Sequence, residues 1–213
     1  MNAPAADPAA PGEPAGWQAQ KSAATRILIV EATVRCLVEF GYAGATTQAI
    51  AAKAGLSRGA MLHHFPAKAD VLHATVEHLA PARLAALDKA LAGERSSAAI
   101  HRVLEAAAAH ARQPLSLAAA ELTLAARTDR ELAAVVAPAQ SAYARGWLER
   151  MRAALPAPAR PARELDAALD SVRHALEGMA LAPPAAEGRV RQEARLGFLE
   201  AGLRALMHAP APG

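Results

Sequence analysis

The sequence predicts an all-α protein, with a small amino-terminal three-helix domain and a larger carboxy-terminal helical domain. Hydrophobic residues make up 53% of its 213 residues, alanine dominates them, and aromatic residues make up only 3%. β-branched residues form no alternating runs, whereas apolar residues recur at helical spacing along most of the chain. This content is enough for a sizeable core. We expect three regions, with bounds 1–20, 21–67 and 68–213.

The first region has little to bury. Residues 1–20 contain four prolines among alanines and no basic residue, which predicts a disordered arm without a role in a DNA minor groove. The first helix is expected to begin at Lys21 or Ser22 and to end at Gly41. Its apolar stripe comprises Ile27, Val30, Val34 and Leu37. Cys36, the only cysteine, lies among these positions, so we expect it to pack in the core rather than to act as a redox sensor.

Residues 46–66, TTQAIAAKAGLSRGAMLHHFP, predict two short helices joined by a tight turn. Thr46 and Thr47 carry hydroxyls that can cap the first helix. Gly55 can take the left-handed conformation that ends this helix, because it has no Cβ. Ser57 is then placed to cap the second helix, and the segment has the geometry of a helix-turn-helix.

The second short helix has an inward and an outward face. Met61 and Phe65 lie one turn apart and can pack inward. The outward face carries Arg58, Gly59, Leu62 and His63. Arg58 can fork onto a guanine, and the small residues Gly59 and Ala60 allow the backbone to approach base edges. Lys68, just beyond this helix, is expected to contact a phosphate. These features favour binding in a DNA groove.

Residues 25–79 resemble the DNA-binding domain of the TetR family of bacterial transcriptional regulators. The resemblance rests on ILIVEATVRCLVEFG, the following Gly-Tyr stop, TTQAIAAKAGLSRGA and HHF-P-x-K in this order. It implies that DNA is contacted by Thr47, Arg58, Gly59, Ala60, His63, His64 and Lys68; the candidate set also includes Gln48, Ser57 and Leu62. Leu62 departs from the family pattern, which has a phosphate-contacting tyrosine there, and it can instead pack on a thymine methyl or a sugar. The resemblance also implies a divergent carboxy-terminal domain that binds a small ligand and dimerises.

The formal net charge of +3 is small, but most of the excess lies near the helix-turn-helix. Residues 21–80 carry six Lys or Arg and four Asp or Glu. This balance supports phosphate contact and also fits an ordinary solvated surface. No apolar run is long enough to span a bilayer, and the amino terminus does not read as a signal peptide, so we expect a cytoplasmic protein with no membrane partner.

Seven further helices are expected after the helix-turn-helix. Their approximate ranges are 68–79 with a break or kink at Pro81, 82–93, 96–112 capped by Ser96 or Ser97, 114–127, 128–155 with a kink at Pro138, and 163–182, followed by a last helix over 187–206. The Pro-rich stretch 156–162 is expected to be a linker.

The helices over residues 82–155 carry the candidate ligand-binding residues His101, Glu121, Tyr143 and Trp147. Tyr143 and Trp147 lie one turn apart and can form a pocket wall. Glu121 adjoins an apolar stripe and needs a partner, either a structural one, such as an arginine of a neighbouring helix, or a polar group of a ligand. The alanine-rich composition favours an apolar or amphipathic effector. His101 and His110 fall on opposite edges of one stripe, so no metal site is predicted there.

The last helix has apolar residues on two faces, which predicts a second packing partner. We expect this helix and its predecessor to form a four-helix interface in a homodimer. The candidate interface residues are Leu169, Val172, Leu176, Val190, Ala194, Gly197, Ala201 and Ala205. Two-fold symmetry then predicts a near-palindromic double-stranded operator.

The sequence contains no common catalytic or cofactor motif, such as HExxH, GxSxG, a phosphate-binding glycine loop or paired cysteines. We therefore expect no enzyme activity and no cofactor. The preferred hypothesis is a homodimeric repressor that a small ligand releases from DNA. The alternative is a helical ligand-binding or adaptor protein with a vestigial DNA-binding domain.

Overall fold

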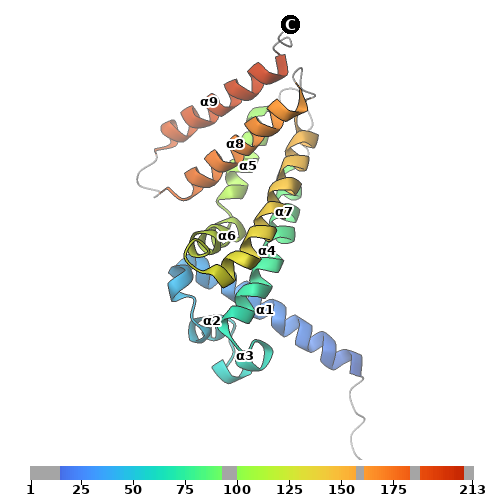
Figure 1. Ribbon diagram of the computed structural model, residues 1–213, viewed down its shortest axis with the longest axis vertical. Helices are drawn as coiled ribbons and strands as arrows, with labels where there is room; N and C mark the ends of the chain where they lie inside the picture. Colours follow the sequence, from blue (N-terminus) through green and yellow to red (C-terminus); the bar gives the residue numbers. More distant parts are fainter. Residues whose placement is uncertain (1–14, 93–99, 157–160, 183–187, 209–213) are drawn as a thin grey trace, which may run out of the picture.

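The computed structural model describes residues 15–92, 100–156, 161–182 and 188–208, and within these ranges it contains nine α-helices and no strand. The helices are α1 (Ala15–Gly44), α2 (Thr47–Lys53), α3 (Arg58–His64), α4 (Lys68–Leu91), α5 (Ile100–Ala111), α6 (Pro114–Ala125), α7 (Arg130–Ala154), α8 (Ala162–Ala180) and α9 (Arg189–His208). Figure 1 shows α2 and α3 at one end of the molecule and α8 and α9 toward the other. The predicted all-α class is confirmed.

Helices α1 to α3 form the headpiece, and its short helices begin and turn where local chemistry predicts. Thr46 caps α2 by accepting a hydrogen bond from the Ala49 amide at 3.2 Å, and Ser57 caps α3 through the Ala60 amide at 3.1 Å. Gly55 has a φ of +70° in the turn between them. The geometry of a helix-turn-helix is therefore present.

Helix α1 begins earlier than predicted. It starts at Ala15 rather than at Lys21 or Ser22, so residues 15–20 are helical, and residues 1–14 of the expected arm lie outside the described residues. The Lys21 ammonium group lies 4.9 Å from the centroid of the Trp17 ring. The two residues are one helical turn apart, so this contact supports the earlier start of the helix. Gly41 interrupts the helical backbone with φ +67° and ψ −179°, which is the stop expected there, although the assigned range continues to Gly44.

The two internal prolines do not divide their helices. Helix α4 continues through Pro81 and α7 through Pro138, so the predicted break and the separate helix over 82–93 are wrong. Both prolines are exposed. Each proline leaves the carbonyl group one turn earlier without a backbone donor. Because the prolines are exposed, water can donate a hydrogen bond to this carbonyl group instead. The expected Ser96 or Ser97 cap and most of the linker over 156–162 lie outside the described residues.

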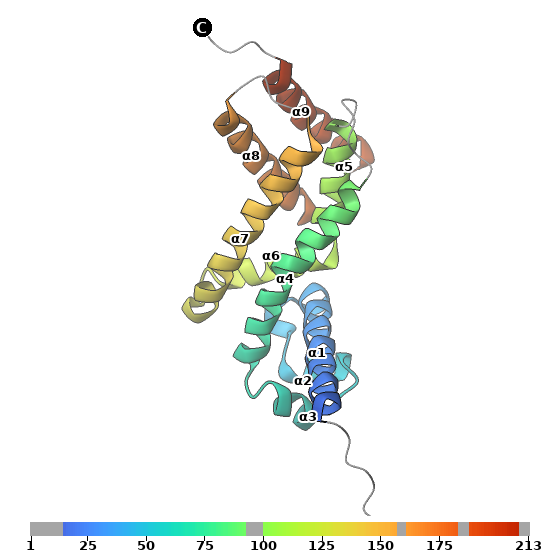
Figure 2. The same ribbon diagram turned by 90° about the vertical axis from the view of Figure 1, so that its right-hand side faces the viewer.

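Two apolar cores stabilise the fold. One joins the headpiece to α6 and to the adjoining ends of α4 and α7, and the other lies among α4, α5, α7, α8 and α9. Figure 2 shows α6 lying across the molecule between the headpiece and the upper helices. None of the described helices has the length and hydropathy needed to cross a membrane.

Candidate functional site

The outward face of α3 is accessible, because the inward face supplies its packing. Met61 and Phe65 are buried in the core, as predicted from their spacing. Of the candidate DNA-contact residues, Gln48, Ser57, Arg58, Gly59, Ala60 and His63 are exposed, and Thr47, Leu62 and His64 are half-buried. Around Gly59, an added Cβ atom would meet open space. The outward face of α3 therefore presents a cation, imidazole rings and a glycine at which another molecule can approach the backbone closely.

An arginine from α1 holds the end of this helix. Arg26 donates a hydrogen bond from its guanidinium group to the His64 carbonyl oxygen at 2.6 Å. The same guanidinium group lies 4.0 Å from the centroid of the Phe65 ring. A cation at the carboxy-terminal end of a helix compensates its unpaired carbonyl groups and its dipole. Arg26 therefore fixes the orientation of α3, a role for which the sequence contains no local signal.

Lys68 contacts other residues of the protein in this structure. Its ammonium group donates to the Tyr42 carbonyl oxygen at 3.0 Å and lies 4.4 Å from the centroid of the Tyr42 ring. Burial lowers the pKa of Lys68. Tyr42 follows the interruption of the helix at Gly41, and its contacts hold the Lys68 amine against the protein. Lys68 therefore stabilises the junction of α1 and α4.

Glu121 connects α6 to the headpiece rather than to a cavity. Its carboxylate accepts a hydrogen bond from the Tyr42 backbone amide at 3.3 Å, so it has a structural partner, which is a backbone amide rather than an arginine. The Tyr42 hydroxyl group donates to Asp129 at 3.0 Å. The Leu132 amide and this hydroxyl group lower the pKa of Asp129, while burial and the Asp129 contact raise the pKa of Tyr42. The headpiece is thus bonded to both α6 and the start of α7.

His101 does not line a cavity. Its Nδ1 atom lies 2.9 Å from the Glu200 carboxylate, which ties α5 to α9, and its side chain is 45% exposed. Trp147 is buried in the core among α4, α5, α7, α8 and α9. Both residues thus have partners within the protein, and a ligand contact by either of them stays a prediction. No group of His, Cys, Asp or Glu among the described residues is arranged to hold a metal ion.

A candidate ligand cavity has a volume of about 450 Å³ and is lined by α4, α5, α6, α7 and α8. It extends beyond the expected range of 82–155, because α8 forms one wall. Its apolar lining includes Leu117, Leu124 and Leu181, and its polar lining includes Ser116 and Thr123. Tyr143 does not line this cavity but supports a residue that does.

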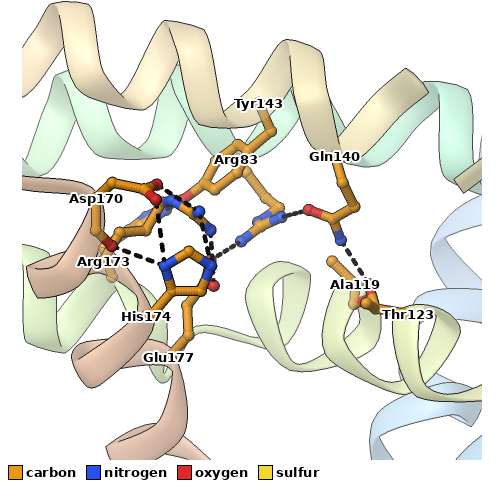
Figure 3. A network of polar contacts seen from close by, with 10 residues as sticks. Arg83, Ala119, Thr123, Gln140, Tyr143, Asp170, Arg173, His174 and Glu177 are labelled. Carbon is orange, nitrogen blue, oxygen red and sulfur yellow. Dashed lines mark hydrogen bonds and ion pairs between the residues drawn. The ribbon is translucent and has the colours of Figure 1, made fainter. Parts of the chain in front are cut away.

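That residue is Arg83, which is 3% exposed and packs its guanidinium group on the Tyr143 ring at 3.4 Å from the centroid. Figure 3 shows this group directed toward Gln140 and Glu177, with which it forms hydrogen bonds of 3.4 and 3.1 Å. The other carboxylate oxygen of Glu177 accepts from Arg173 at 3.0 Å. Two arginines on different helices thus share one carboxylate at the cavity wall.

His110 supports the same network from α5. Its Nε2 atom lies 3.0 Å from the Tyr143 hydroxyl oxygen, and the residue is buried. Burial, with a smaller contribution from the positive charge of Arg83, lowers the pKa of His110 to about 4. The imidazole is therefore neutral near pH 7.

The polar cavity residues Ser116, Arg83, Gln140, Arg173 and Glu177 are absent from the sequence-based candidates. Arg83 nevertheless has a recognisable signal, because it continues the buried stripe that includes Val76, Leu79 and Leu87. A cation at an apolar position of a helix needs buried partners. Its register therefore indicates a polar site, although the identity of its partners depends on the fold.

The predicted dimer residues divide into two groups. Leu169, Val172 and Leu176 are buried within the same chain, against the core among α4, α5, α7, α8 and α9, so they are not available to a partner. The other candidates, Val190, Ala194, Gly197, Ala201 and Ala205, lie on α9 and are exposed. Phe198, next to this face, is 79% exposed, and Val190 is 80% exposed. An apolar helix face is therefore available at this end of the chain.

Comparison with known proteins agrees with this architecture. Residues 29–75 match the family of bacterial regulatory proteins described as the tetR family. The HTH-type transcriptional regulator CymR of Pseudomonas putida is 42% identical over 62 residues, which are 29% of this chain and 30% of that protein. The matched segment thus spans less than a third of this relative.

Solved structures show similarity along most of the chain. A transcriptional regulator from Rhodococcus sp. Rha1 has a TM-score of 0.63 at 19% identity, over 84% of this chain and 95% of the other. Salmonella enterica GusR has a TM-score of 0.60 at 17% identity, over 86% and 95%. The multidrug binding protein EbrR complexed with malachite green has a TM-score of 0.54 at 23% identity, over 85% and 97%. Residues 29–75 thus match the helix-turn-helix domain of the tetR family of bacterial regulatory proteins, and the chain shares its overall fold with these solved structures.

Proposed function

We propose that this regulator is a repressor that binds a near-palindromic operator as a homodimer and is released by a small ligand. The observation that carries DNA binding is the exposed face of α3 with Arg58, Gly59 and His63. Its backing residues are buried, and Arg26 fixes its carboxy-terminal end. A rigid helix with an exposed arginine and small residues is suited to major-groove readout.

Release by a ligand is supported by the cavity and by the helices around it. The volume of about 450 Å³ lies in the range of small-molecule sites. Helix α6 carries Ser116 and Thr123 in the cavity lining and also Glu121, which is bonded to the headpiece at Tyr42. Helix α4 carries Arg83 at the cavity and begins at Lys68, which also contacts Tyr42. A ligand that favours one position of α6 and α4 therefore changes the orientation of the headpiece.

Homodimerisation is supported by the exposed apolar face of α9. Helix α8 contributes its open side to the same surface, where Ala175 and Met179 adjoin Ala194 and Phe198. Exposed apolar surface of this kind is typical of an interaction site. Two copies joined there present two α3 helices to one duplex, and the distance between them determines operator affinity.

DNA binding is tested by gel shift on the promoter region beside the gene, using the full chain and its Arg58→Ala and His63→Ala variants. We expect both substitutions to weaken sequence-specific binding by about 1–3 kcal/mol for a base-contacting side chain. The matched control is Arg145→Ala, which removes an exposed arginine from α7, far from the headpiece in sequence. Unaltered binding by both headpiece variants would refute the proposed interface.

The alternative is an adaptor or ligand-binding protein with a vestigial headpiece, and the leucine at position 62, in place of the family's tyrosine, gives it some weight. An adaptor should show neither sequence preference nor a steep salt dependence of DNA affinity. Leu62 is half-buried, and Arg58 and His63 on the same face are exposed. The presence of Leu62 is therefore compatible with a functional α3.

A further inference from the structure

The cavity wall combines buried cations with polar atoms that have no partner in the protein. Arg83 and Arg173 each have a buried Nε atom without a hydrogen-bond partner among the described residues, and Ser116 has a buried hydroxyl group in the same condition. All three residues line the cavity of about 450 Å³. Buried donors without acceptors are unfavourable, so a ligand that supplies acceptor oxygens would be stabilised there.

The charges around these donors favour an anion. Arg83 and Arg173 share the carboxylate of Glu177. These three are the charged residues among the described residues that line the cavity, counting Lys, Arg, Asp and Glu. Asp170 also pairs with Arg173, but its side chain is 53% exposed and does not line the cavity. The lining itself therefore carries one more positive than negative formal charge, which Asp170 partly offsets from outside the cavity. In a partly desolvated site, this excess attracts a single negative charge more strongly than it would in water.

The cavity also has an apolar part. Leu117, Leu124 and Leu181 form much of its lining together with several alanines. The described lining contains no Phe, Tyr or Trp that could form an aromatic cage for a cation. The Tyr143 ring nearby is covered by the Arg83 guanidinium group. A lipophilic cation would thus meet neither an aromatic face nor an unpaired carboxylate.

From these observations we propose that the effector is an amphipathic monoanion, with a carboxylate or similar oxyanion head bound near Arg83, Arg173 and Ser116 and a hydrocarbon body against the leucines. This inference rests on the proposed role of the cavity as the effector site. Guanidinium and hydroxyl donors match the acceptor oxygens of a carboxylate, and charge-assisted hydrogen bonds are the stronger kind. Because these Nε and hydroxyl atoms are buried in this structure, binding requires the side chains to turn toward the head group.

Calorimetry on the full chain, without DNA, tests the head-group preference. The probes are octanoate, octanamide and octylammonium, which share a hydrocarbon chain and differ in charge, and a second pair, 2-naphthoate and 2-naphthamide, with a ring-shaped body. We expect the carboxylate of at least one set to bind about tenfold or more tightly than its amide, as charge-assisted hydrogen bonds to buried arginine imply. Octylammonium should bind more weakly than octanoate.

Two variants locate the preference. Ser116→Ala removes the free hydroxyl group, and Arg173→Gln removes one cation while Glu177 keeps its partner Arg83. Both should reduce carboxylate affinity by several-fold and leave amide affinity unchanged. Arg150→Gln is the matched control, because it also breaks an arginine ion pair, with Asp88, outside the cavity lining. Circular dichroism confirms that each variant is folded.

The proposal is overturned if neither carboxylate is preferred over its amide, if octylammonium binds as tightly as octanoate, or if both cavity variants keep the full preference. A gel shift with the same probes separates this result from the proposed function. Operator release by octylammonium or an amide alone would leave the regulator intact and refute the anionic effector. Carboxylate binding without any operator binding would support the site and refute the DNA-binding role.

Discussion

At the scale of single residues, burial of His110 makes stability depend on pH. Its pKa is lowered to about 4 in the folded chain, against about 6.5 for an unperturbed histidine. Between these values the unfolded chain binds a proton that the folded chain does not, so stability is lost as pH falls through this window. By pH 5 the loss from this residue is about 2 kcal/mol, from 1.36 kcal/mol for each pKa unit.

Urea unfolding of the wild type and of His110→Gln at pH 7 and pH 5 measures this effect. The glutamine can still form a hydrogen bond with Tyr143 but does not titrate. We expect the variant to lose about 2 kcal/mol less than the wild type between the two pH values. His73→Gln, at an exposed position of α4, should keep the wild-type pH dependence. Equal losses for wild type and His110→Gln would contradict a neutral buried imidazole.

Lys68 makes a second residue-scale prediction, because its ammonium group faces the protein. Lys68→Gln removes the hydrogen bond to the Tyr42 carbonyl oxygen and the contact with the Tyr42 ring. We expect a loss of about 1 kcal/mol in the free energy of unfolding. The slope of operator affinity against salt concentration should remain unchanged, since no phosphate contact is lost.

The matched control for Lys68 is Lys89→Gln, at an exposed position near the carboxy-terminal end of the same helix. This variant should change neither the stability nor the salt slope. If Lys68→Gln instead lowers the salt slope by about one, as expected for one lost phosphate contact, then Lys68 turns toward DNA in the complex.

At the scale of elements, the junction of α1 and α6 depends on the backbone at Gly41. Its φ of +67° with ψ of −179° lies in a region that is essentially restricted to glycine. An added Cβ atom would also lie 3.3 Å from a carboxylate oxygen of Glu121. Gly41→Ala should therefore destabilise the protein by about 2 kcal/mol, measured by urea unfolding.

Gly55→Ala separates backbone strain from steric contact. Gly55 also has a positive φ, of +70°, but an added Cβ atom there would meet open space. We expect this variant to cost about 1 kcal/mol, less than Gly41→Ala. A Glu121→Ala background should reduce the cost of Gly41→Ala but not that of Gly55→Ala. Equal costs at the two glycines in both backgrounds would rule out the proposed contact between α1 and α6.

Local features of the elements are predictable from the sequence, and features that join distant segments are not. The caps at Thr46 and Ser57 and the turn at Gly55 depend on residues within one turn, and the structure confirms them. Arg26 and His64 are 38 residues apart, so their contact depends on how α1 crosses α3. The predicted break at Pro81 is wrong, because the exposed proline can be accommodated within the helix. This exposure depends on the fold and cannot be seen from the proline alone.

The candidate sites follow the same division. The outward face of α3 could be read from helical spacing, because one short helix carries it. The cavity could not, since Arg83, Arg173 and Ser116 come from three helices that only the fold brings together. Glu121 and His101 read as cavity residues by their register, but each has a partner on another element. Register indicates which residues face inward and does not identify what they face.

At the scale of the whole molecule, the exposed face of α9 places the headpiece and the proposed dimer interface at opposite ends of the chain (Figure 1). Dimerisation there would fix the separation of two α3 helices through α4 and α7, which pack along one another. Operator affinity then requires the interface, although no residue of α9 contacts DNA. A monomer should retain only weak, salt-sensitive binding.

Phe198→Glu tests this arrangement, because it places a charge on a side chain that is 79% exposed in the single chain. Folding of the subunit should be unaffected, whereas burying the carboxylate against a partner would be unfavourable. Light scattering at micromolar concentration should show a dimer for the wild type and a monomer for the variant, with operator affinity reduced in parallel. Ile27→Glu, at a 54% exposed position of α1, should remain dimeric. A monomeric wild type, or a Phe198→Glu variant that stays dimeric, would exclude this face as the interface.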